Sequence, residues 1–202
     1  MISKDAYKKI DRFEERQQSI QDISQFSNIV HNLQSTSKNV RQEAARKLGE
    51  LGVEDAVEPL LLALFDEEDV AVRIQIIEAL SQLGTDEAIA GIMDMFDDPD
   101  NSVRRAAINT LRGIDSDEVI DELMYLANED RDRSIRLVAI DALFQYEDEK
   151  VSQMLAELSS DPDPTIRDAI KHGIEQEAKI KRPQAKSPTR KDKGARRQRT
   201  KR

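Results

Sequence analysis

Residues 69–84 read DVAVRIQIIEALSQLG, and this stretch carries the pattern that decides the fold. Counting from Arg73, apolar residues stand one position before and three, seven and ten positions after it. This spacing places them on one face of an α-helix. Asp69 stands where a helix N-cap is expected, and Gly84 stands where a left-handed C-terminal residue is expected. The stretch therefore predicts a capped amphipathic helix.

The same pattern recurs along the chain with a period of 31 or 32 residues. A β-branched residue precedes an arginine in every copy, and the arginines are Arg41, Arg73, Arg104, Arg136 and Arg167. The expected N-cap residues, four positions earlier, are Ser37, Asp69, Asp100, Asp132 and Asp163. A second apolar-periodic segment precedes each cap, at residues 23–33, 56–65, 88–96, 119–127 and 151–158. Each unit thus predicts helix, turn, helix, and such units stack into an α-solenoid.

We therefore expect an all-α superhelix of about five helix-turn-helix repeats. The predicted repeats are residues 22–53, 54–84, 85–115, 116–147 and 148–178. Residues 1–21, with Tyr7, Ile10 and Phe13 among charged residues, predict an N-terminal capping helix. At the other end, Lys171 stands where the earlier repeats have Ala or Ile, as a terminal repeat with a polar outer face requires.

Two segments carry a resemblance to a known family. Residues 40–52, VRQEAARKLGELG, and residues 161–169, DPDPTIRDA, resemble the HEAT-like repeats first grouped with phycobilisome lyases. The resemblance covers roughly residues 22–178. The family includes bilin lyase subunits, deoxyhypusine-hydroxylase-type iron enzymes and many adaptor proteins. The resemblance therefore implies an armadillo-like helical fold and leaves the function open.

The net charge of −9 is the sum of a strongly acidic segment and a strongly basic one. Residues 179–202 hold twelve Lys and Arg against the single acid Asp192, a charge of +11, so residues 1–178 carry −20. The tail has almost no large apolar side chain, and we expect it to be disordered on its own. Its predicted polyanion-binding residues are Lys181, Arg182, Arg190, Lys191, Lys193, Arg196, Arg197, Arg199, Lys201 and Arg202. They suit RNA, DNA or an acidic protein surface, including the acidic body of this chain.

The arginine of each repeat has an acidic residue six positions before it in four of the five units. These acids are Glu67, Asp98, Asp130 and Asp161, with Ser35 in the first repeat. We expect the arginines and acids to pair across repeat boundaries as a ladder, because a guanidinium forms fork-shaped hydrogen bonds with a carboxylate. The alternative is a row of arginines that binds an anionic ligand.

Residues one, five and eight positions after each arginine point away from the core. They lie on the helix face that the resemblance implies to be the concave surface. The predicted protein-binding residues on this surface are Ile74, Arg105, Arg112, Leu137 and Phe144. Exposed apolar side chains beside arginine are typical of interface cores. In the alternative, Leu137 and Phe144 pack under a neighbouring helix.

The sequence offers little for catalysis. It has no Cys, which excludes disulfides and thiolate nucleophiles. His31 and His172 are far apart, and neither is followed by Glu, so the His-Glu pairs that supply iron ligands in the resembling hydroxylases are missing. No phosphate-binding loop or catalytic triad pattern is present. We therefore expect no catalytic residue, no metal site and no cofactor.

These observations predict a non-catalytic scaffold or adaptor. One or more proteins would bind the concave surface, and the tail would attach the chain to nucleic acid or to an acidic partner. The alternative is an accessory subunit of a bilin-lyase-type enzyme or of another enzyme complex. No stretch approaches the roughly 18 apolar residues that cross a bilayer, and the first twenty residues are charged throughout, so we expect a soluble, cytoplasmic protein.

Overall fold

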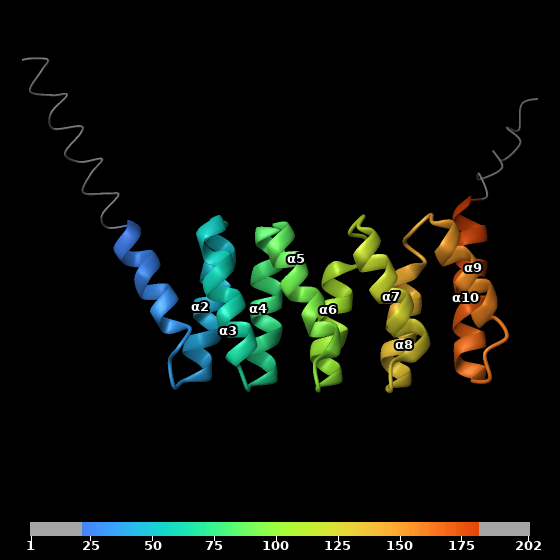
Figure 1. Ribbon diagram of the computed structural model, residues 1–202, viewed down its shortest axis with the longest axis horizontal. Helices are drawn as coiled ribbons and strands as arrows, with labels where there is room; N and C mark the ends of the chain where they lie inside the picture. Colours follow the sequence, from blue (N-terminus) through green and yellow to red (C-terminus); the bar gives the residue numbers. More distant parts are fainter. Residues whose placement is uncertain (1–21, 182–202) are drawn as a thin grey trace, which may run out of the picture.

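The computed structural model describes residues 22–181, which form a row of antiparallel helix pairs (Figure 1). The first helices of the pairs are residues 22–32, α3 (Val57–Asp66), α5 (Asp86–Met93), α7 (Asp117–Glu129) and α9 (Glu149–Leu158). The second helices are α2 (Lys38–Leu51), α4 (Val70–Leu83), α6 (Asn101–Leu111), α8 (Arg133–Leu143) and α10 (Pro164–Lys181). The short 3-10 helices η1 (Glu54–Ala56) and η2 (Asp94–Asp97) adjoin α3 and α5.

The helices form two layers. Second helices pack side by side, with α4 between α2 and α6, and α8 between α6 and α10. First helices form the other layer, in which α3 contacts α5, and α7 contacts α9. We call the outer surfaces of these layers the second-helix face and the first-helix face. The predicted all-α solenoid is confirmed, and no strand occurs within residues 22–181.

The core lies between the two layers. Val72, Ile76 and Leu80, the positions one before and three and seven after Arg73, are all fully buried at 0% exposure. Most of the matching residues in the two end repeats are buried as well. The exceptions are Val40 in the first repeat, which is 38% exposed, and Ile174 in the last, which is 49% exposed.

The tenth position after each arginine was expected in the core, and the structure corrects this. Leu51 is 46% exposed, while Leu83, Ile114 and Tyr146 are half-buried at the edge of the row. This position lies at the end of each second helix: Leu51 and Leu83 are the last residues of α2 and α4, and Ile114 and Tyr146 lie beyond the ends of α6 and α8. Lys171 is exposed, as a terminal repeat requires.

Helix termini follow the sequence signals closely. Asp69, Asp100 and Asp132 accept hydrogen bonds from amides in the first turns of α4, α6 and α8. Ser37 is the exception, because its side chain makes no capping hydrogen bond to α2. Gly84 ends α4 with φ 64°, the left-handed conformation that glycine tolerates best.

The two ends of the chain lie outside the described residues, and with them the predicted capping helix at residues 1–21 and most of the basic tail. Helix α10 continues through Lys181, so the expected boundary after residue 178 falls inside this helix. No helix in the described part of the chain is long and apolar enough to cross a membrane.

Candidate functional site

The repeating arginines form a ladder along the turns that join the helices of each pair. Arg104 Nε lies 3.0 Å from Asp130 Oδ2, and its Nη2 donates to Oδ1 at 3.2 Å. Its Nη1 also donates to the Asp98 carbonyl at 2.8 Å, six residues back. One guanidinium therefore closes its own turn and holds the turn of the next repeat.

The other rungs repeat this arrangement. Arg41 donates to both carboxylate oxygens of Glu67, at 2.6 and 2.8 Å. Arg73 Nε lies 2.8 Å from Asp98 Oδ2, and its Nη2 donates to Oδ1 at 3.0 Å. Three cross-repeat pairs of the predicted ladder are thus confirmed. Their guanidinium groups are engaged, which argues against the alternative of a row of arginines that binds an anionic ligand.

The fourth rung differs from the expectation. Arg136 Nη2 lies 3.8 Å from Asp163 Oδ2, and not against Asp161. The Asp161 carboxylate accepts the backbone amide of Asp163 at 2.7 Å, the same contact that Asp98 makes with the Asp100 amide at 2.8 Å. Within residues 22–181 no further repeat follows Arg167, and its Nη1 donates to the carbonyls of its own turn at 2.7 and 3.0 Å.

The ladder acids also organise the helix starts. Glu67 accepts the backbone amide of Asp69 at 2.9 Å, and Asp130 accepts that of Asp132 at 2.7 Å. Burial alone would raise the pKa of Glu67, but hydrogen bonds from Arg41 and the Asp69 amide outweigh it and lower this pKa below its ordinary value. The Glu67 carboxylate is therefore a structural charge, held ionised by its partners.

The predicted protein-binding residues on the second-helix face divide into two groups. Leu137 and Phe144 line one groove together, between α8 and α10. Ile74 on α4 and Arg105 on α6 lie outside this groove. Arg112 Nη2 donates to the carbonyl and to Oδ2 of Asp141, at 2.8 and 2.7 Å, so it ties α6 to α8.

The groove between α8 and α10 has a volume of about 320 Å³. Leu137 and Phe144 are half-buried and pack against the core, which is the arrangement that the alternative interpretation described. The Phe144 ring reaches across to α10, where a Cβ added at Gly173 would lie 2.2 Å from it. Polar residues complete the lining, among them Asp141, His172 and Gln176.

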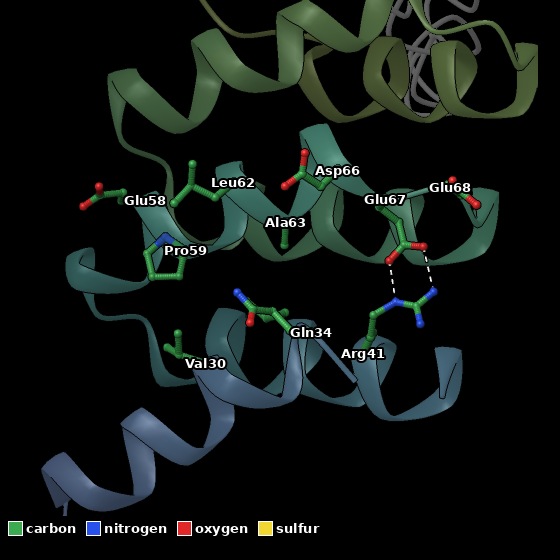
Figure 2. Close-up of a pocket in the computed structure, with 11 residues that line it drawn as sticks. Val30, Gln34, Arg41, Glu58, Pro59, Leu62, Ala63, Asp66, Glu67 and Glu68 are labelled. Carbon is green, nitrogen blue, oxygen red and sulfur yellow. Dashed lines mark hydrogen bonds and ion pairs between the residues drawn. The ribbon is translucent and has the colours of Figure 1, made fainter. Parts of the chain in front are cut away.

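A larger groove on the first-helix face was not singled out from the sequence. It lies between residues 22–32 and α3, and its volume is about 450 Å³ (Figure 2). Its apolar lining comes from Val30, Leu33, Pro59, Leu62 and Ala63. Its carboxylates come from Glu58, Asp66, Glu67 and Glu68. The acidic run at residues 66–68 was the available signal in the sequence.

Within residues 22–181, no group of three or more His, Asp or Glu side chains is arranged to hold a metal ion. Of the predicted tail residues, only Lys181 lies in the described part, at the end of α10. The remaining tail residues, from Arg182 to Arg202, lie outside it.

Comparison with known proteins agrees with this architecture. The chain is 42% identical over 65 residues to a HEAT repeat-containing taxis protein of Halobacterium salinarum, which covers 32% of this chain and 16% of that protein. It also resembles the phycocyanin lyase complex of CpcE and CpcF from Nostoc sp. PCC7120, with 23% identity, a TM-score of 0.56, and coverage of 73% of this chain and 63% of that one. A designed armadillo repeat protein in complex with the peptide (KR)4 matches with 16% identity, a TM-score of 0.50, and coverage of 80% and 85%.

At these identities the solved structures show a shared fold alone. The chain spans only a small part of the taxis protein and less than two thirds of the lyase chain. The HEAT repeats family itself matches residues 27–108 and 89–175, which together include all five helix pairs in whole or in part. The chain belongs to the HEAT repeat family.

Proposed function

We propose that the chain is a non-catalytic adaptor with two attachment points. The solenoid binds a protein segment in the groove between α8 and α10, and the basic tail attaches the complex to a polyanion. The observation that carries the proposal is the pairing of Leu137 and Phe144 in one groove with a polar rim. Such a groove accepts an apolar anchor residue of the partner, and the polar rim can form hydrogen bonds with the partner residues beside that anchor.

Repeat solenoids serve as extended binding surfaces, which supports this class of function. The designed armadillo protein of similar fold was solved with a peptide bound. In the present chain the arginines of the ladder are engaged in structural contacts, and Arg112 is tied to Asp141. The proposed partner segment is therefore anchored by apolar contact in the groove, and the tail binds the polyanion.

The tail would attach through phosphate or carboxylate contacts without base recognition, because it has no aromatic side chain for stacking. The proposal predicts a steep salt dependence, with log K falling by about 0.7–0.9 per decade of salt for each phosphate contacted. Fluorescence anisotropy with a labelled single-stranded RNA tests this across a salt series. A chain lacking residues 182–202 that binds the RNA as tightly as the full chain would refute the role of the tail.

The groove is tested by Phe144→Ala in a nuclease-treated pull-down with quantitative mass spectrometry. The matched control is Phe65→Ala on the first-helix face, where the ring is 58% exposed and outside the groove. Circular dichroism confirms that each variant is folded. We expect the partner recovered with the wild-type chain to be retained by Phe65→Ala and lost by Phe144→Ala. Equal recovery with both variants would remove the groove from the proposal.

A further inference from the structure

The groove on the first-helix face between residues 22–32 and α3 is open because no side chain fills it. One pair further along, Gly91 of α5 lacks a side chain, and a Leu61 methyl group lies 2.1 Å from where its Cβ would stand. That contact lets α3 and α5 close on each other. The groove before α3 keeps about 450 Å³, and Leu62 at its edge is 62% exposed.

One wall of this groove is rigid. Arg41 and Glu67 join in a two-point hydrogen bond across it, as the dashed lines in Figure 2 show. Arg41 also donates to the Ser35 carbonyl at 2.8 Å. The guanidinium is therefore fixed by the fold, and its charge is balanced by Glu67.

The remaining acids of the groove, Glu58, Asp66 and Glu68, are exposed, and their carboxylates form no ion pair within the described residues. The groove between α7 and α9 differs, because only two carboxylates, Glu129 and Glu157, line it, and the cation Lys150 stands beside them. An apolar floor under unbalanced carboxylates suits Lys and Arg, whose aliphatic stems pack on apolar surface while their charged ends remain at the rim.

We propose that this groove holds the end of the chain's own basic tail, residues 196–202. Five of these seven residues are cations: Arg196, Arg197, Arg199, Lys201 and Arg202. The stems would lie over Pro59 and Leu62, and the charged groups would meet Glu58, Asp66 and Glu68. Other acids of the solenoid are exposed too, among them Asp86 and Glu87, but Glu58, Asp66 and Glu68 stand together around an apolar groove.

The tail is long enough to reach the groove in the same molecule. Helix α10 ends at Lys181, at the opposite end of the row from residues 22–32 (Figure 1). Four helix spacings of about 8–10 Å make about 40 Å. The first fourteen tail residues, 182–195, extend to about 48 Å at about 3.4 Å per residue. Residues 196–202 can therefore reach the groove when the tether is nearly extended.

The consequence is a choice between two positions for the tail. In the absence of polyanion the tail occupies the groove, and a polyanion competes for the same cations. The proposed function needs the tail to bind polyanions, but occupation of the groove does not depend on that property. The two ideas can therefore fail separately.

Carbodiimide coupling of the full-length chain tests the occupant directly, because this reagent joins only amines and carboxylates already in contact. At low salt and without polyanion, we expect Lys201 to couple with Glu58, Asp66 or Glu68, as mapped by mass spectrometry. Adding heparin as a competing polyanion should remove these products. Because an exposed ion pair contributes only a factor of a few, the double variant Glu58→Gln with Glu68→Gln should lower the yield at Asp66 by about tenfold.

The matched control removes the same charge elsewhere. Asp86→Asn with Glu87→Gln neutralises two exposed acids of α5, and we expect the coupling yield at Asp66 to stay within about twofold, since distant exposed charges are screened. Coupling of Lys201 spread evenly over acids along the solenoid would overturn the proposal. A mixture of ¹⁵N-labelled and unlabelled chains distinguishes the source of the tail. Products joining a labelled to an unlabelled chain would overturn the assignment to the same molecule.

Discussion

Replacing Arg104 by Met is expected to be the most damaging single change to the ladder. Arg104 is 3% exposed, and the Asp130 side chain opposite is 5% exposed. Met fills a similar volume but leaves Asp130 buried without its cation and the Asp98 carbonyl without its donor. Removing one member of a buried, hydrogen-bonded pair costs about 3–5 kcal/mol. That loss is a large part of the roughly 5–15 kcal/mol that stabilises a typical domain.

Equilibrium urea unfolding, followed by far-ultraviolet circular dichroism, measures this loss. Arg167→Met is the matched control, because Arg167 closes its own turn in the same way but has no acid from a following repeat. It is exposed, and we expect it to cost about 1 kcal/mol or less. The double variant Arg104→Met with Asp130→Leu removes both charges and should recover most of the stability. Equal losses for Arg104→Met and Arg167→Met would refute a cross-repeat role for the ladder.

Three further changes test other parts of the fold. Tyr146→Phe removes the hydroxyl that accepts the Gly113 amide at 3.0 Å, and should cost about 1 kcal/mol in urea unfolding. Gly173→Ala places a Cβ 2.2 Å from the Phe144 ring, so the ring must leave its position and we expect a loss of about 1–3 kcal/mol, reduced by the better helix propensity of Ala. The pKa of Asp132 is lowered to about 2 by hydrogen bonds from the Ser134 hydroxyl, Asn101 and the Ser134 amide. Because this folded value lies below the unfolded value of about 3.9, its stabilisation is present above about pH 4 and lost toward pH 2, and Asp132→Asn should flatten stability over that range.

Each of these changes has a control on the same chain. Tyr125→Phe alters a tyrosine that is 57% exposed on α7, and it should leave stability unchanged. Glu175→Ala alters an exposed residue of α10 near Gly173, and a loss as large as that of Gly173→Ala would contradict the steric explanation. Asp86→Asn removes an exposed carboxylate from the first turn of α5. If Asp86→Asn flattens the pH dependence of stability in acid as much as Asp132→Asn does, the Asp132 cap is not the source of that dependence.

The fold could be predicted from the sequence because its signals are local and repeated. The period of the β-branched residue and arginine, the Asp caps and the glycine at the end of α4 each specify a helix boundary without reference to distant residues. The ladder could also be predicted, since its partners recur at a fixed spacing. In its last cross-repeat rung Arg136 lies near Asp163 and not near Asp161, a departure that the fixed spacing does not explain.

The binding surfaces were harder to predict, because they depend on how neighbouring helices meet. Angles around one helix place Leu137 and Phe144 outside its own core face, but they do not show that Gly173 on α10 receives the Phe144 ring. In the same way, the groove before α3 exists because nothing enters it as Leu61 enters the space beside Gly91. The sequence of a single helix does not encode which of its neighbours leaves a gap.

The arrangement of charges separates the scaffold from its attachment. In the solenoid, Arg41, Arg73 and Arg104 pair with carboxylates of the next repeat. Their guanidinium groups therefore stabilise the stacking of the repeats and do not serve to bind a ligand. The tail carries its cations without such partners in sequence, since Asp192 is its only acid. Any surface of the solenoid that attracts the tail must then have carboxylates that the ladder does not use. The groove beside α3 meets that condition and adds an apolar floor beneath Glu58, Asp66 and Glu68, which is why we propose it as the place where the tail binds.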